Sequence, residues 1–233
     1  MQLFLAEIQG NLFELHTDEV NHCVRVLRKS VGDVIQFITG DGNLYEGSIV
    51  TITKKSVSGT WTKVQDQFGD VGYDLTVAIA PTKNMDRIEA FVEKAVEMGI
   101  TRIVPIICDH SERKIVKTSR LKKIALSATK QSLKGALVQI DEPQSFDEFI
   151  RQPHENLCIA HCETDTSKTP LKHLLIPNSA TTIMIGPEGD FSKSEILRAT
   201  KAGAKPVHLG SSRLRTETAG LVAVAVVYDT LGK

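Results

Sequence analysis

Residues 182–195 read TIMIGPEGDFSKSE, and this stretch decides the fold class. The apolar run 182–185 predicts a strand that is buried on both faces. Gly186 to Asp190 form a Gly/Pro turn, and Ser192 with Glu195 forms a capping box that begins a helix. A strand that leads through a short turn into a helix is the building unit of a parallel α/β sheet.

The same alternation begins near Asp74 and runs to the end of the chain. Further strands are predicted at Leu75–Ala80, Arg102–Cys108, Leu157–Cys162 and Val207–Leu209, and further helices at Asn84–Met98, Ser119–Leu133, after the capping box of Ser145 and Glu148, and at Thr216–Leu231. The last of these helices is apolar almost all round, which predicts burial in the core or in a subunit interface.

The first seventy residues have a different, β-rich texture. Val34–Ile38 and Leu44–Thr53 flank a Gly-Asp-Gly turn and predict a hairpin, and Ser56–Val64 predicts a further strand. A short helix over Asp18–Arg28, with Thr17 as its N-cap, interrupts the strands. The polar segment Gln65–Tyr73 is a natural linker. We therefore predict two domains, residues 1–72 and 73–233.

Composition limits the class of protein. The formal net charge is zero, 41% of the residues are hydrophobic and 24% are charged, as in ordinary soluble globular proteins. No apolar run approaches the roughly 18–20 residues that span a bilayer. The N-terminal residues have neither the basic nor the long apolar region of a signal peptide. We expect a cytoplasmic protein without a membrane partner.

The four cysteines are irregularly spaced, which is not the pattern of a disulfide framework. His154, Cys158, His161 and Cys162 invite interpretation as a metal site. However, no second Cys/His pair stands at the spacing of a structural zinc site, and the run NLCIAHC has the character of a strand. We expect reduced thiols and no metal.

The charge is unevenly distributed along the chain. Residues 110–134 contain eight basic side chains and one acidic side chain, Glu112. Such a segment is either a solvated helix face or a surface that binds phosphates.

Two strand-to-helix turns carry the candidate ligand site. In open α/β sheets, ligands bind outside the carboxyl ends of the strands. The first turn follows Ile185 and the second follows Leu209, and both contain glycine, which lets the backbone approach a ligand. Neither turn is a dinucleotide or P-loop motif. Taken alone, each is either a ligand site or simply a tight loop.

Five motifs stand in order over essentially the whole chain. They are HCVRVLR at 22–28; Lys83 with Arg87, Glu89, Lys94, Glu97 and Gly99; Ser111-Glu112-Arg113 with Gln131-Ser132; IGPEG at 185–189; and LG at 209–210 with LRTETA at 214–219. Together they resemble the SPOUT-class 16S rRNA (uridine-N3)-methyltransferase family, RsmE.

The resemblance implies a PUA-like β-barrel followed by a SPOUT parallel-sheet domain with a trefoil knot, in a homodimer. It also implies S-adenosylmethionine as the methyl donor and 16S rRNA of the small ribosomal subunit as the partner. The residues that it assigns to the donor, together with our candidates for the pocket, are Ile185, Gly186, Glu188, Gly189, Leu209, Gly210, Leu214, Thr216 and Thr218. Thr216 and Thr218 either contact the donor or cap the helix.

Four positions depart from the family pattern. Asp190 stands where the family usually has Gly, and Ser212-Arg213 stands where it usually has Arg-Ile. Glu93 takes a position that is commonly Gln. None of these departures removes Gly186, Gly189, Arg215, Glu217 or Thr218, so they do not indicate loss of activity.

The acceptor chemistry singles out two residues. Uracil N3 carries a proton at neutral pH, so its removal needs a base and its carbonyl oxygens need hydrogen-bond donors. Arg215 suits the second role, because its guanidinium stays charged; its alternative is a salt bridge with Glu217 or Glu188. Glu217 is a candidate for the base, although a carboxylate in a first helical turn is also favoured by the helix dipole.

RNA binding is predicted for both domains. The candidates are His22, Arg25, Arg28, Lys83, Lys94 and Arg113. Lys94 could instead pair with Glu97 on its own helix. Two alternative functions remain at this stage: another SPOUT reaction such as ribose 2′-O-methylation, and a non-catalytic rRNA-binding or assembly protein.

Overall fold

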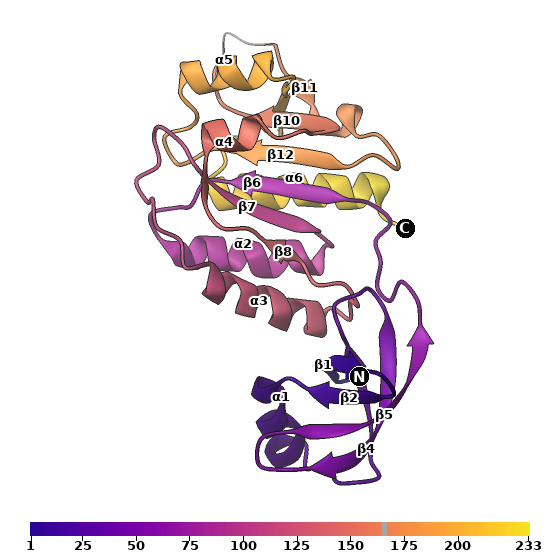
Figure 1. Ribbon diagram of the computed structural model, residues 1–233. Coiled ribbons are helices and arrows are strands. Elements are labelled where there is room, and N and C mark those ends of the chain that lie inside the picture. Colours follow the sequence, from indigo (N-terminus) through magenta and orange to yellow (C-terminus); the bar gives the residue numbers. More distant parts are fainter. Residues whose placement is uncertain (165–166) are drawn as a thin grey trace. The chain divides into compact units, whose positions relative to one another are not determined.

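The computed structural model describes residues 1–164 and 167–233 of the chain, and they form two compact units (Figure 1). The first unit comprises Met1–Asp70 and Leu126–Leu137, and the second comprises Val71–Ala125 and Val138–Lys233. The chain passes from the first to the second inside the predicted linker. Because the end of one long helix belongs with the first unit, a single boundary does not describe the division.

The first unit is a closed five-stranded barrel, with strand order β1-β2-β5-β4-β3. Its strands are β1 (Leu3–Gln9), β2 (Leu12–Leu15), β3 (Val34–Ile38), β4 (Leu44–Ile52) and β5 (Val57–Gln65). All neighbours pair antiparallel except β1 and β3, whose parallel pairing closes the barrel.

Aromatic side chains fill the barrel. The ring centroids of Phe13 and Phe37 lie 4.9 Å apart, and Tyr45 stacks on Phe37 at 5.4 Å. Trp61 meets Tyr45 edge-on at 5.3 Å. Strand β2 alternates strictly between exposed and buried residues, because one of its faces points into this core.

A short helical segment connects β2 with β3. It consists of α1 (Thr17–Asn21) and the π-helix η1 (His22–Val26). The prediction that Thr17 is the N-cap was wrong: Thr17 is already helical, His16 occupies the N-cap position, and no side chain caps this end. The backbone supplies the cap instead, because Glu19 N–H donates to the carbonyl of His16.

The second unit is built on an eight-stranded parallel sheet. Seven strands follow the order β11-β13-β10-β12-β6-β7-β8, and β9 pairs with β7 beyond β8. The strands are β6 (Leu75–Ile79), β7 (Arg102–Ile107), β8 (Gln139–Ile140), β9 (Gln144–Ser145), β10 (Asn156–Ala160), β11 (Thr169–Pro170), β12 (Thr181–Ile185) and β13 (Lys205–His208).

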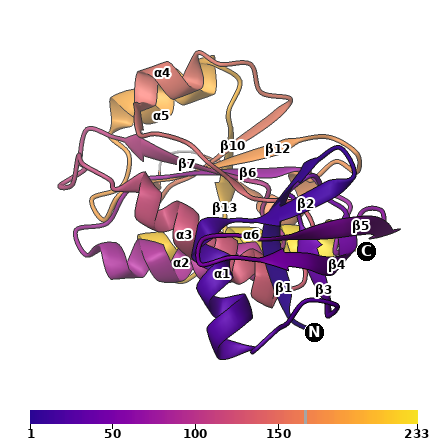
Figure 2. The same ribbon diagram turned by 60° about the horizontal axis from the view of Figure 1, so that its bottom comes forward.

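The helices are α2 (Met85–Glu97), α3 (Thr118–Gln131), α4 (Phe146–Ile150), α5 (Lys193–Lys201), α6 (Thr216–Leu231) and the 3-10 helix η2 (Leu171–Leu174). Within the second unit, α4 and α5 cover one face of the sheet and α2 and α6 cover the other (Figures 1 and 2). None of the helices in the described residues is long and apolar enough to cross a membrane.

Helix α6 packs closely on α2 because of Gly220. A Cβ atom at this position would lie 2.7 Å from the ring of Phe91 and 3.1 Å from Ile79. The buried face of α6 also contains Ala223, Val224 and Val227. Tyr228, on the other side, is 49% exposed. The helix therefore contributes one face to the core, and the rest of its apolar surface reaches the outside of this chain.

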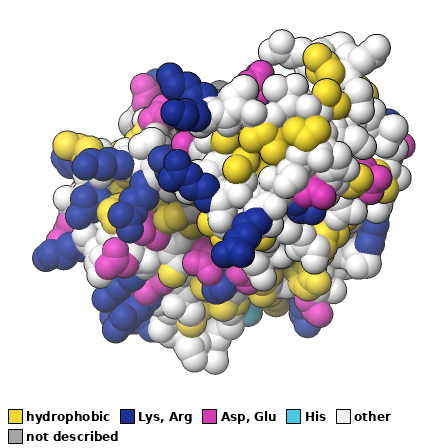
Figure 3. All heavy atoms as spheres, turned by 90° about the horizontal axis from the view of Figure 1, so that it is seen from below, with side chains coloured by type: hydrophobic (Ala, Val, Ile, Leu, Met, Phe, Trp, Pro, Cys, Tyr) yellow, Lys and Arg dark blue, Asp and Glu magenta, His cyan; other side chains and the backbone are white. Residues whose placement is uncertain are grey.

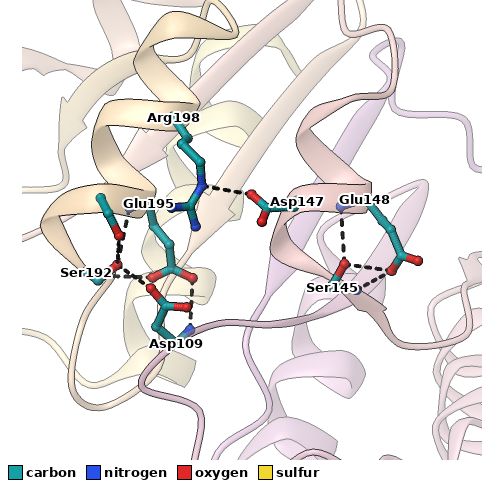
Figure 4. Close-up of polar contacts among 8 residues, drawn as sticks. Asp109, Ser145, Asp147, Glu148, Ser192, Glu195 and Arg198 are labelled. Atoms are coloured by element: carbon teal, nitrogen blue, oxygen red, sulfur yellow. Dashed lines mark hydrogen bonds and ion pairs between the residues drawn. The ribbon is translucent and has the colours of Figure 1, made fainter.

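Capping boxes fix α4 and α5 as the sequence predicts (Figure 4). The Ser192 hydroxyl accepts from Glu195 N–H at 3.2 Å, and the Glu195 carboxylate accepts from Ser192 N–H at 2.8 Å. The fully buried Glu195 also accepts from Asp109 N–H, and Ser192 donates to the Asp109 carboxylate. The loop after β7 is thereby tied to the start of α5, directly after the β12 turn.

The predicted fold class is confirmed: an N-terminal β-barrel precedes a mainly parallel α/β sheet. The predicted hairpin is β3 and β4, and the longer strands and helices fall within a few residues of their predicted places. The trefoil knot stays a prediction.

Candidate functional site

The site lies where three neighbouring strands end. Strand β10 lies between β13 and β12, and Ala160 pairs with both Val207 and Ile185. Because the strands are parallel, their carboxyl ends and the loops that follow meet at one edge of the sheet. A cavity of about 810 Å³ opens there.

This volume is in the range of small-molecule sites, about 300–1,000 Å³. The cavity is lined by Ala160, His161, Cys162, Lys168, Ile185, Gly186, Pro187, Glu188, Gly189, Asp190, Val207, His208, Leu209, Gly210, Ser211, Ser212, Arg213, Leu214, Arg215, Thr216 and Ala219.

The cavity gathers most of the residues that the sequence assigns to the donor. All of them line it except Thr218, which is exposed on α6 and lies outside the lining. Arg215 lines the cavity, whereas Glu217 does not. The two motif-bearing turns, far apart in sequence, thus form the walls of one pocket.

Thr216 joins the two turns. Its buried hydroxyl donates a hydrogen bond of 3.0 Å to the carbonyl of Gly186. The Thr216 side chain does not cap α6, which has no side-chain cap. Its hydroxyl bonds to the turn after β12 instead. The start of α6 is therefore anchored to the end of β12.

Asp190 contributes to the turn after β12 through its backbone conformation and through its carboxylate. Its backbone has a φ of 63°, in the left-handed region where glycine is usual. Its carboxylate accepts from Cys162 N–H at 2.7 Å and from Phe191 N–H at 2.8 Å. The departure from the family's usual glycine therefore adds a tie between the loops after β10 and β12.

Arg215 has neither of the salt bridges that we considered. Glu188 accepts instead from the backbone N–H of Lys83 at 3.0 Å, and Glu217 lies 3.9 Å from Nε of Arg87 on α2. One carboxylate oxygen of Glu217 is buried without a hydrogen-bond partner. Among the described residues no ion pair engages Arg215, whose exposed side chain lines the cavity.

His161 is a pocket residue that sequence reasoning considered only as a metal ligand. It follows β10 directly, is 7% exposed, and neither ring nitrogen has a hydrogen-bond partner within the described structure. Burial, and then the nearby charge of Lys168, lower its pKa from the ordinary value. The available signal was its place at the carboxyl end of a buried strand.

The candidate zinc ligands do not form a metal site. Within residues 1–164 and 167–233, no group of three or more His, Cys, Asp or Glu side chains could hold a metal ion. Cys158 is buried in β10, where burial raises the pKa of its thiol to about 11, and Nε2 of His154 lies 3.1 Å from the carbonyl of Phe149. The four cysteines are free thiols.

Two predicted RNA-binding residues of the second unit lie on loops at the same sheet edge. Lys83 follows β6 and forms an ion pair with Glu112 at 3.2 Å. Arg113 follows β7, and its guanidinium donates to the carbonyl of Lys83 at 2.9 and 3.2 Å. Lys94, in contrast, lies 2.8 Å from both Glu93 and Glu97, so the pairing alternative is the one that the structure shows.

The predicted RNA-binding residues of the first unit differ in exposure. Arg25 and Arg28 are exposed, and neither has an ion-pair partner in the described part of the chain. His22 is half-buried beside Phe4, with a ring-centroid distance of 6.0 Å, and its Nε2 is buried and unpartnered. On the face drawn in Figure 3, basic side chains lie among acidic ones.

A parallel sheet with a pocket of small-molecule size at its carboxyl edge, in a chain that also forms a small β-barrel, defines an α/β protein with a small-ligand site. A family model described as "RNA methyltransferase domain" matches residues 71–228, and one described as "RNA methyltransferase PUA domain" matches residues 15–60. The chain belongs to this RNA methyltransferase family, and its predicted membership in the RsmE family is confirmed.

Proteins that resemble this chain in sequence or in structure are also named as rRNA methyltransferases. The chain is 29% identical to ribosomal RNA small subunit methyltransferase E of Rickettsia conorii, over 94% of this chain and 90% of that protein. A probable rRNA-methyltransferase from Porphyromonas gingivalis has 37% identity and a TM-score of 0.88, with 99% and 98% of the chains covered. Ribosomal RNA small subunit methyltransferase E from Neisseria gonorrhoeae, bound to S-adenosyl methionine, has 25% identity and a TM-score of 0.85, with 100% and 98% covered.

The hydrogen bond from Thr216 to Gly186 makes a prediction for stability. Thr216→Val keeps the shape but leaves the buried carbonyl unpaired, so the free energy of unfolding should fall by about 1–3 kcal/mol. Thr216→Ser keeps the hydroxyl and loses one methyl group, which should cost only about 0.8 kcal/mol. Urea unfolding measures both. A valine variant that is no less stable than the serine variant would show that this bond does not join the turns.

Proposed function

We propose that this protein transfers a methyl group from S-adenosylmethionine to N3 of a uridine in 16S rRNA of the small ribosomal subunit. The observation that carries the proposal is the single pocket formed by both motif-bearing turns at the carboxyl ends of β10, β12 and β13. Relatives named as small subunit rRNA methyltransferases, one of them bound to this donor, support the substrate class and the cofactor.

The residues of the pocket fit S-adenosylmethionine. Ile185, Leu209 and Leu214 offer apolar surface for the adenosine, and the glycines of both turns leave room for it beside the backbone. His161, buried directly after β10, also lines this pocket. When bound, the donor supplies a methyl group on a positively charged sulfur.

The chain's own contribution is to hold and polarise the acceptor base. Arg215 is placed for this role, because its exposed guanidinium lines the pocket and no carboxylate of the described residues neutralises it. It would donate hydrogen bonds to a uracil carbonyl and stabilise the negative charge that develops as N3 loses its proton. Glu217 pairs with Arg87 and does not line the pocket, which favours a structural role. That Glu217 is the base stays a prediction.

We assign RNA binding to both predicted domains, residues 1–72 and 73–233. In the barrel, Arg25 and Arg28 are exposed and available for phosphates. In the second unit, Arg113 and Lys83 lie on loops at the edge of the sheet where the pocket opens. Lys94 contributes less, because two carboxylates already compensate its charge. Together with an rRNA substrate, we propose a cytoplasmic location.

We also propose that the protein is a homodimer and that α6 contributes to the interface. The helix is apolar almost all round, yet only one of its faces is buried within this chain. Ala225 and Tyr228 are exposed on the remaining surface, which would leave apolar area in water in a monomer.

The modified nucleoside tests the proposed reaction. A strain that lacks this protein should lose 3-methyluridine from its small-subunit rRNA, measured by mass-spectrometric nucleoside mapping, and the wild-type gene should restore it. If 3-methyluridine stays at its full level, the proposed specificity is wrong. Loss of a 2′-O-methylated nucleoside instead would point to ribose as the acceptor.

Arg215→Ala tests the catalytic assignment. The variant should bind S-adenosylmethionine with nearly wild-type affinity while kcat falls by about 10²–10³-fold, as on removal of a donor that stabilises developing negative charge. Arg215→Lys keeps the positive charge but lacks the planar guanidinium, so its kcat should lie between those of the alanine variant and the wild type. If kcat of the alanine variant is unchanged, Arg215 has a structural role and no catalytic one.

Sedimentation equilibrium tests the dimer. The protein should sediment at twice its chain mass of 25.6 kDa. Tyr228→Glu places a charge on the exposed face of α6 and should shift the equilibrium toward the monomer. A wild-type protein that is monomeric at all concentrations would contradict the proposed interface.

A further inference from the structure

His110 is an exposed histidine on the loop after β7 whose ring reaches the turn after β12. Its Nδ1 lies 3.0 Å from the carbonyl oxygen of Gly189 and 3.0 Å from that of Asp190. Both partners are acceptors, so Nδ1 carries a hydrogen and donates it to the two oxygens in a three-centre bond. These contacts assign the tautomer of the neutral ring, in which Nε2 is left as the acceptor.

The loop that carries His110 is held on both sides of this residue. Ser111 N–H donates to the carbonyl of Cys108 at 3.0 Å, and Cys108 N–H donates to the Ser111 hydroxyl at 2.9 Å. Asp109 N–H donates to the fully buried Glu195 carboxylate at 2.9 Å, in the first turn of α5 (Figure 4). The imidazole is therefore presented by backbone that hydrogen bonds hold in place.

The segment that His110 contacts has a backbone conformation that needs support. Asp190 N–H donates to the carbonyl of Pro187 at 2.9 Å, which closes a tight turn, and Asp190 has a φ of 63°. This left-handed conformation is costly for a residue other than glycine and persists where the surroundings hold it. Gly189 leaves space for the histidine, since a Cβ atom there would lie 3.1 Å from the Cβ of His110. The ring thus bonds to the last two carbonyl groups of the turn.

Gly189 and Asp190 line the pocket, whereas His110 does not, so the histidine acts on the site through the turn. We propose that His110 is a positioning residue for the reaction. Its Nδ1–H holds Gly189 and Asp190 in the conformation that forms this wall of the pocket. The proposal rests on the proposed function, because it takes S-adenosylmethionine as the ligand, but the assigned tautomer is independent of any ligand.

A positioning role separates binding from chemistry. When the turn is not held, only the fraction of molecules with a formed pocket binds, so the Kd of each ligand that needs this wall rises by the same factor. Once the donor is bound the wall is formed, and kcat at saturating donor concentration stays unchanged. A variant of His110 should therefore raise the KM for S-adenosylmethionine and leave kcat as it is.

Calorimetric titration with S-adenosylmethionine and S-adenosylhomocysteine tests the proposal. His110→Leu removes the donated hydrogen and should raise both Kd values by the same factor, about tenfold, for the loss of the bonds to two carbonyl groups. His110→Asn places an amide N–H as many bonds from the backbone as Nδ1 and should restore most of the affinity. His110→Gln carries its N–H one bond further out and should restore less. His173→Leu is the matched control, because His173 is exposed on η2 outside the pocket lining, and it should bind as the wild type does.

Nuclear magnetic resonance of the ligand-free protein tests the tautomer. The ¹⁵N chemical shifts of the neutral ring, recorded at alkaline pH, should identify His110 as the Nδ1–H form. The Nε2–H form would overturn the proposal, whatever the protein binds. If the wild type binds neither S-adenosylmethionine nor S-adenosylhomocysteine and His110 is in the Nδ1–H form, the proposed function has failed and the contact of His110 with the turn has not.

The remaining outcomes of the titrations are also decisive. Wild-type affinity of His110→Leu would overturn the proposal. Equal weakening in the leucine and asparagine variants would overturn it too, because the shape of the ring and not its donated hydrogen would then matter. Different factors for the two ligands would indicate direct contact with the donor, and a lower kcat at saturating donor concentration would assign His110 to the chemistry; either result contradicts a positioning role.

Discussion

The parallel register of β13, β10 and β12 is the constraint on which the site depends. Ala160 pairs with Val207 on one side and with Ile185 on the other, so the three strands end in one row. Parallel strands need crossover connections, which bring every carboxyl end to the same edge. A shift of this register would displace the turn after Ile185 relative to the turn after Leu209 and would exchange the faces on which the strand side chains lie.

Hydrogen bonds connect the loops that follow these strand ends. Thr216 bonds to Gly186, Asp190 bonds to Cys162, and Glu188 bonds to Lys83. Each joins the end of β12 to a different segment. The walls of the pocket are therefore joined to one another by hydrogen bonds between loops.

The sequence was sufficient to predict most of this architecture because its signals are local. Apolar runs identify the buried strands, and the serines at 145 and 192 locate two helix starts through their capping boxes. The first two barrel strands, β1 and β2, were not located. Neither were the two-residue strands β8, β9 and β11, since such short pairings depend on neighbours distant in sequence.

The site shows the same division between local and non-local information. The glycines and apolar residues of both turns were found because they sit in motifs, and the structure gathers them in one cavity. The pairing of Glu217 with Arg87 and the burial of His161 could not be predicted, because both follow from packing between separate elements. Asp190 was noticed only as a departure from the family, and its contact with Cys162 explains how a carboxylate is accommodated there.

The claim that both turns form one donor pocket is tested most directly by a crystal structure of the protein grown with S-adenosylhomocysteine. We expect ligand density between Gly186 and Gly210, enclosed by the ends of β10, β12 and β13. Density for the ligand at any other place, or an empty pocket at saturating ligand concentration, would contradict the claim.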